Sequence, residues 1–89
     1  MTSRTTEAFR RLLAELPPPV RRQAREAYKR WHTDPWQRGL QFKRVHTREP
    51  IWSVRVSLSW RAVCVRSDEA AIWFWIGSHA DYDALLTRL

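Results

Sequence analysis

The sequence contains one cysteine, no long hydrophobic run and few acidic residues, and each shortage excludes some classes of protein. Cys64 is alone, so no disulfide can form within the chain, which fits a reducing compartment. The longest apolar run, residues 70–77, is far shorter than the ~20 residues that span a bilayer. Residues 1–11 lack the continuous apolar segment of a secretory signal. We therefore expect a cytoplasmic protein without membrane association.

Metal-binding patterns are also missing. His32 and His46 belong to loop or edge segments and have no metal-ligand spacing with Cys64 or with each other. We expect neither a metal site nor a cofactor.

Positive charge is abundant, and arginine carries most of it. Sixteen Lys+Arg against nine Asp+Glu give a net charge of +7, and fourteen of the sixteen cations are arginine. The planar guanidinium pairs bidentately with phosphates and carboxylates, whereas lysine acts as a point charge. This bias favours an anionic partner, either nucleic acid or an acidic protein that covers the same surface. A basic surface kept only for solubility is the alternative.

The periodicity of apolar residues predicts one domain, residues 1–89, of the α+β class. Helical spacing over residues 9–16 and 20–31, with three prolines between them, predicts an N-terminal helical hairpin. Residues 40–46, 52–59, 61–66 and 71–76 follow with strand-like patterns. Ser78 resembles an N-cap with Asp81 as its capping-box partner, which predicts a short C-terminal helix. The hairpin is expected to pack on a four-stranded, mainly antiparallel sheet.

This order of elements resembles the RelE/ParE superfamily of bacterial toxins. The resemblance runs from about residue 9 to residue 86. It rests on the strings LQFKRV, IWSVRVSLSWRAVCV and WFWIGSHADYDALL, on an arginine that opens the third strand, and on a Gly-x-His-x-x-Tyr tail. RelE-like members cut messenger RNA in the ribosomal A site without metal, and ParE-like members inhibit DNA gyrase without catalysis. Both kinds are neutralised by an antitoxin.

The resemblance thus implies a ribosome-dependent, metal-independent mRNA endonuclease that inhibits translation. Its implied partners are a cognate antitoxin, the ribosome and mRNA, with operator DNA contacted only by the toxin–antitoxin complex. Two alternatives stay open: a ParE-like gyrase inhibitor, and a noncatalytic nucleic-acid-binding relative. The arginines and the histidine of the second half favour the nuclease, because a gyrase inhibitor has no need of them.

Metal-free RNA cleavage needs a base for the 2′-OH, a cation for the charge on the phosphate, and an acid for the 5′-oxygen. Arg61 matches the family arginine that contacts the scissile phosphate; alternatively, it forms an ion pair with Asp81 or Glu69. Arg55 matches a cationic position of the second strand and either binds phosphate or lies on a solvated face. Ser53 stands where RelE-like members carry a lysine.

His79 and Tyr82 complete the predicted catalytic set. His79 matches a basic or histidine position after the last strand, and among arginines a neutral imidazole is favoured, which can act as a base. Alternatively, it is an ordinary residue of the first helical turn. Tyr82 either stacks on a base and positions the 2′-OH or packs in the core. Asp81 either orients His79 or only caps the helix.

The predicted RNA-binding residues surround this set. Lys43 and Arg44, on the first strand, join Arg55 in contacting phosphates, unless they only form a solvated edge. Trp60, in a turn, either stacks on RNA bases or is covered by the antitoxin.

Overall fold

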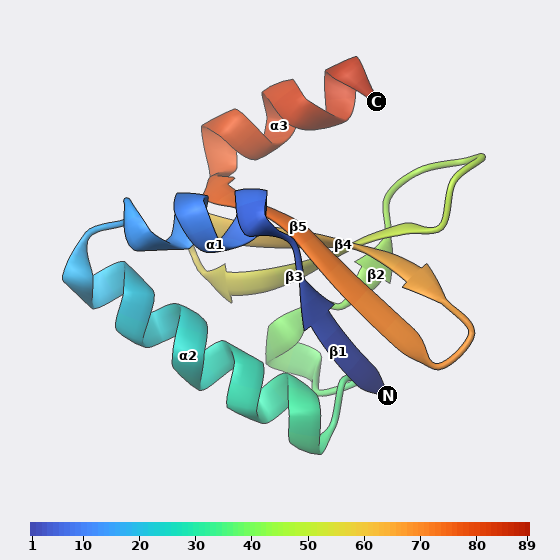
Figure 1. Cartoon of the computed structure of the whole chain (residues 1–89), viewed down its shortest axis with the longest axis horizontal. Coiled ribbons are helices and arrows are strands. Elements are labelled where there is room, and N and C mark those ends of the chain that lie inside the picture. The colour runs from blue at the N-terminus through green and yellow to red at the C-terminus, as the bar shows by residue number, and fades with distance from the viewer.

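The chain folds into a five-stranded sheet with helices on both faces (Figure 1). The computed structural model describes all residues, 1–89. The helices are α1 (Glu7–Ala14), α2 (Pro18–Thr33) and α3 (His79–Arg88), with a short 3-10 helix, η1 (Arg38–Leu40). The strands are β1 (Thr2–Thr5), β2 (Lys43–Arg44), β3 (Ile51–Ser57), β4 (Trp60–Ser67) and β5 (Ala70–Ser78). No helix is both long and apolar enough to cross a membrane.

The sheet has one strand more than predicted. Strands β2 to β5 form the expected antiparallel meander. The order of strands across the whole sheet is β1-β5-β4-β3-β2. The additional strand, β1, pairs parallel with β5, and its segment is mostly exposed and polar. An edge strand of this kind has no alternating apolar pattern, because its stability comes from main-chain pairing with a distant segment.

The first predicted strand, residues 40–46, is also different. Only Lys43 and Arg44 pair with β3, and the residues before them form η1 and a bend at Gln41, whose φ is 46°. Leu40 and Phe42 are nevertheless both buried. The apparent strand alternation thus comes from a turn that directs two apolar side chains into one core.

The two N-terminal helices pack on the sheet more than on each other. The Thr6 side chain caps α1 by accepting a hydrogen bond of 3.0 Å from Phe9 N. Helix α2 begins at Pro18, so Pro18 and Pro19 both lie in its first turn. Helix α1 contacts mainly β5 and α2 contacts mainly β3, so the two helices of the predicted hairpin pack on different strands of the sheet.

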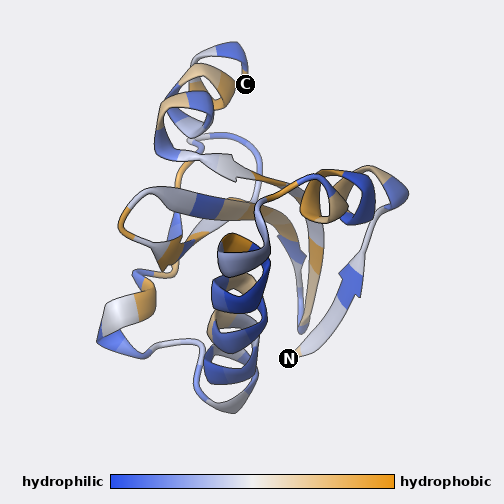
Figure 2. Cartoon of the chain, turned by 90° about the vertical axis from the view of Figure 1, so that its left-hand side faces the viewer, coloured by the Kyte–Doolittle hydropathy of each residue, from blue (hydrophilic) through white to orange (hydrophobic).

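Each face of the sheet has its own apolar cluster. The larger cluster lies under α1 and α2 and includes Trp31, Cys64 and Trp73. The smaller cluster lies under α3 and consists of Ile51, Val63, Tyr82 and Leu85. Coverage of both faces explains why β5 is apolar in both phases. Figure 2 shows the result, with apolar colours on the strands and inner helix sides and hydrophilic colours along the outer side of α2.

Candidate active site

Two arginines lie opposite each other on neighbouring strands at one end of the sheet. Arg55 of β3 is the register partner of Arg61 of β4. Side chains alternate along a strand, so Arg55 shares a face with Ser53, which bonds to α3. The pair therefore lies on the α3 face. Both side chains are half-buried, and neither forms an ion pair with a carboxylate.

Backbone carbonyls of the β3–β4 turn hold Arg61 in place. Its Nη1 donates to the carbonyl oxygens of Ser57 at 2.7 Å, Trp60 at 3.0 Å and Leu58 at 3.3 Å. The alternative ion pair with Asp81 or Glu69 is therefore not formed. Burial, and secondly the charge of Arg55, lower the pKa of Arg61, while Tyr82 and Asp83 oppose this shift. A guanidinium in this position is stabilised by an incoming anion.

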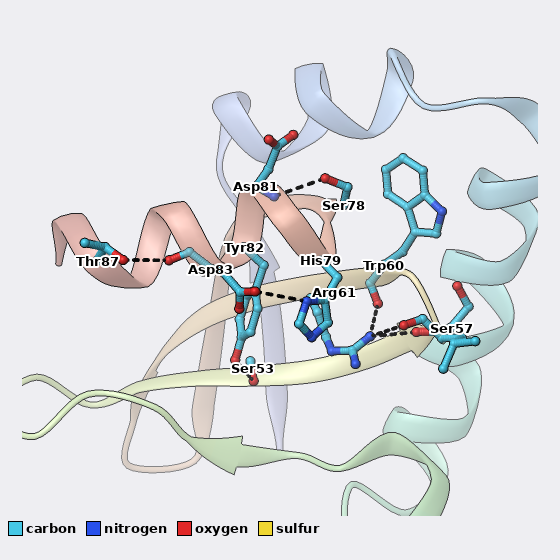
Figure 3. A network of polar contacts seen from close by, with 11 residues as sticks. Ser53, Ser57, Trp60, Arg61, Ser78, His79, Asp81, Tyr82, Asp83 and Thr87 are labelled. Atoms are coloured by element: carbon cyan, nitrogen blue, oxygen red, sulfur yellow. Dashed lines mark hydrogen bonds and ion pairs between the residues drawn. The ribbon is translucent and has the colours of Figure 1, made fainter.

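His79 begins α3 and reaches this end of the sheet through two anchors. The predicted N-cap is confirmed, because Ser78 Oγ accepts a hydrogen bond of 3.1 Å from Asp81 N. The backbone N of His79 donates to Ser59 O of the β3–β4 turn at 2.7 Å. The imidazole and the Arg61 guanidinium therefore lie at the same turn (Figure 3).

The carboxylate of Asp83 lies beside the imidazole of His79. Its Oδ2 lies 3.3 Å from His79 Nδ1 (Figure 3). This contact directs Nδ1 to the carboxylate and leaves Nε2 for other groups. Orienting His79 was one of two roles predicted for Asp81, and the contact of Asp83 with His79 was not predicted. The sequence spacing could have identified Asp83, because residues four apart on a helix are neighbours on its surface.

Tyr82 lies beneath the histidine as a core residue. It is 6% exposed, and its hydroxyl donates a buried hydrogen bond of 2.9 Å to Ser53 Oγ. Its ring packs edge-on to His79, with centroids 5.8 Å apart. Of the two predicted placements, the structure therefore shows the core one. From it, Tyr82 supports His79 and ties α3 to β3.

The predicted RNA-binding residues are divided between the two faces. Lys43 is the register partner of Ser53 and lies on the face of the arginine pair. Arg44 is on the other face, and its guanidinium donates to the carbonyls of the β2–β3 loop. Trp60 is the first residue of β4 instead of a turn residue, and it packs against the larger core. It is therefore less available for stacking on RNA than predicted.

A separate hollow lies on the opposite face. Helices α1 and α2 and the sheet enclose a groove of about 420 Å³, which is lined mostly by apolar side chains such as Phe9, Leu13 and Tyr28. Arg25 and Lys29 are the cations among its lining residues. Trp31 also lines the groove, and its buried Nε1 has no hydrogen-bond partner within the chain. Nowhere do three or more His, Cys, Asp or Glu side chains form a group suited to a metal.

Comparison with known proteins places these features in a family context. The family model that describes the ParE-like toxin domain matches residues 18–84. No curated protein shows significant sequence similarity to the chain. The toxin–antitoxin complexes RelB–RelE of Methanococcus jannaschii and RelBE2 of Mycobacterium tuberculosis contain similar folds. Their TM-scores are 0.72 and 0.70, and their identities are 12% and 23%. The alignments cover 91% and 88% of this chain and 96% of each matched chain.

The isolated RelE toxin of Escherichia coli has the same fold. Its TM-score is 0.66 at 16% identity, and the alignment covers 99% of this chain and 98% of that toxin. At such identities these structures establish the arrangement of helices and strands. The roles of individual side chains have to be argued from their geometry.

Proposed function

Because the chain belongs to the ParE-like toxin family, we propose that it is a metal-independent endoribonuclease that cuts messenger RNA on the ribosome. One observation carries the proposal: Arg55, Arg61 and the His79–Asp83 pair meet at one end of the sheet, and neither arginine forms an ion pair with a carboxylate. The same arrangement disfavours a purely protein-binding gyrase inhibitor, which gains nothing from a free arginine pair beside an oriented imidazole.

Each group has a defined task in this chemistry. Nε2 of His79 takes the proton from the ribose 2′-OH, while Asp83 holds the ring through Nδ1. The 2′-oxygen then attacks phosphorus, and the bond to the 5′-oxygen breaks. Arg61, with Arg55 beside it, stabilises the negative charge that develops on the phosphate oxygens. Its guanidinium is already fixed by the turn carbonyls, so little reorganisation is needed. The departing 5′-oxygen takes its proton from solvent.

In this proposal the protein partner of the chain is a cognate antitoxin, which binds in the apolar groove. The RelB–RelE and RelBE2 structures are toxin–antitoxin complexes. An amphipathic acidic helix suits the groove, because its apolar face meets Phe9, Leu13 and Tyr28 while its carboxylates meet Arg25 and Lys29. A second copy of the chain is disfavoured by its own charge of +7. The groove and the arginine pair lie on opposite faces, so an antitoxin that covers both must pass around the sheet.

Expression in bacteria without the antitoxin tests the nuclease. We expect growth arrest and messages cut at the ribosomal A site, detected by primer extension, and Arg61→Ala should abolish both. The control is Arg38→Ala, which removes an exposed arginine outside the site and should remain toxic. Gyrase-dependent DNA breaks with intact messages would instead identify a gyrase inhibitor. Normal growth with the unaltered chain would indicate a noncatalytic relative.

A further inference from the structure

A polar recess lies on the other side of the β3–β4 turn from Arg61. Helix α2 and the end of β3 enclose a volume of about 660 Å³, lined on the helix side by Arg22, Arg25 and Arg30 and on the sheet side by Ser57. We propose that this recess binds the phosphate backbone of single-stranded RNA, as a second anion subsite beside the Arg55–Arg61 pair. The inference rests on the proposed function, because it takes RNA as the substrate.

The three arginines are free to bind an anion. All three are exposed, and none has a carboxylate within ion-pair distance or a side-chain hydrogen bond to the rest of the chain. Glu26 is the only acidic residue of the recess, and its carboxylate lies 3.5 Å from Lys29 Nζ. Unpaired cations around a hollow concentrate the positive potential there.

The position of the arginines follows from the helix itself. Val20, Ala27 and Trp31 bury one side of α2, so residues at other helical angles face outward. Arg22 and Arg25 are three apart and lie on that outer side, with Arg30 one to two turns further along. From Arg22 to Arg30 the three arginines extend about 12 Å along the helix axis, from eight steps of 1.5 Å each. Figure 2 shows hydrophilic colours over the middle turns of α2 on the side that faces the viewer.

The chemistry of the lining favours RNA over a protein segment. Val56 is the single hydrophobic residue of the recess, so a peptide helix would find no apolar anchor there. The apolar groove shares Arg25 and Val56 with the recess, but most of its lining is apolar, which suits a protein. Phosphate recognition needs no apolar anchor, because arginine forks and the release of counterions supply the affinity.

One residue connects the recess with the proposed active site. Ser57 lines the recess, and its carbonyl oxygen accepts the 2.7 Å hydrogen bond from Arg61. The two groups of arginines therefore lie on either side of the β3–β4 turn, whose tip at Leu58 is 75% exposed. A single strand that crosses this turn contacts both groups, so the recess holds phosphates that flank the reacting one.

The salt dependence of RNA binding tests the subsite. The probe is a fluorescent single-stranded RNA of about 12 nucleotides, and binding is followed by anisotropy without ribosomes. The triple variant R22Q/R25Q/R30Q should reduce the slope of log K against log salt by roughly 2, from about 0.7 for each lost phosphate contact. The matched control, R4Q/R38Q/R48Q, removes the same charge from exposed positions outside the recess and should retain the slope.

Three results would overturn the subsite. These are an unchanged slope in the recess variant, an equal loss in both triple variants, and displacement of the RNA by an equally long polyglutamate at the same concentration. Circular dichroism shows that both variants are folded, and glutamine preserves helix propensity. If Arg61→Ala leaves toxicity intact while the recess variant still reduces the slope, the nuclease proposal fails and the anion subsite stands.

Discussion

Arg55 and Arg61 are direct cross-strand neighbours of like charge, at an end of the sheet where no acidic side chain pairs with either. Like charges directly opposite on adjacent strands destabilise a sheet. The pair is therefore a local cost to folding, and an anion between the two guanidinium groups would relieve it. This is the behaviour expected of a binding site whose charges are arranged for a ligand.

Replacing Arg55 should separate stability from activity. We expect Arg55→Gln to raise the free energy of unfolding by about 0.2–1 kcal/mol, because it removes the repulsion between partly exposed charges. Toxicity should fall in the same variant, since a phosphate contact is lost. Urea unfolding and growth assays measure the two effects. Arg48→Gln, in an exposed loop, should change neither, and a loss of stability in Arg55→Gln would contradict the repulsion.

The carboxylate beside His79 gives a second prediction. Asp83→Asn removes the charge that faces Nδ1, so cleavage of A-site codons in a reconstituted translation reaction should lose part of the ~10²–10⁴-fold contribution of the general base. Asp83→Glu should restore part of the loss. Asp81→Asn is the matched control, because it removes the same charge from the same helix, where the backbone rather than the carboxylate makes the cap contact. Equal activities of the Asp81 and Asp83 variants would exclude the proposed role.

Local patterns in the sequence were sufficient for much of the fold. The antiparallel meander and the Ser78 cap follow from strand alternation and from the capping pattern. Strand β1 could not be predicted in this way, because its polar residues are held by parallel pairing with β5, about 70 residues away. The segment that contains Leu40 and Phe42 imitated a strand, since a bend at Gln41 produces the same order of buried residues.

Sequence patterns predicted only part of the candidate active site. Arg61 and His79 were identified as single residues, but their common attachment to the β3–β4 turn depends on how α3 folds back on the sheet. Trp60 was expected in the turn and is instead the first residue of β4, because β3 ends at Ser57. The division of Lys43 and Arg44 between two faces depends on a register that a two-residue strand does not reveal in its sequence.

The two glycines of the chain offer a controlled test of packing beside the site. A Cβ on Gly77, the register partner of Arg61, would lie 2.6 Å from the Trp75 ring. Gly77→Ala should therefore lower the free energy of unfolding by about 1–3 kcal/mol and displace Trp75, which packs against Tyr82. Gly39→Ala meets no atom within 4 Å and should be neutral or slightly stabilising. Thermal unfolding with tryptophan fluorescence distinguishes them, and equal stabilities would contradict the close contact.

Alkaline pH should weaken the fold through Cys64. This side chain is fully buried in β4, and burial raises the pKa of its thiol to about 12, while Arg66 opposes the shift weakly. In the unfolded chain the thiol ionises near pH 8.5. Between these values the unfolded state binds fewer protons than the folded state, so the free energy of unfolding falls as pH rises, by up to about 1.4 kcal/mol per pH unit. Stability from this source is complete below about pH 8.5.

The variant Cys64→Ala isolates this effect from other groups that ionise in the same range. It should be less stable than the unaltered chain at pH 7, because it leaves a small cavity in the larger core. Above about pH 9 the difference should shrink and then reverse, since alanine has no proton to lose. Urea unfolding at a series of pH values measures both curves. Parallel curves up to pH 11 would mean that the thiol ionises equally in both states, and that water reaches the core beneath α2 more readily than its packing implies.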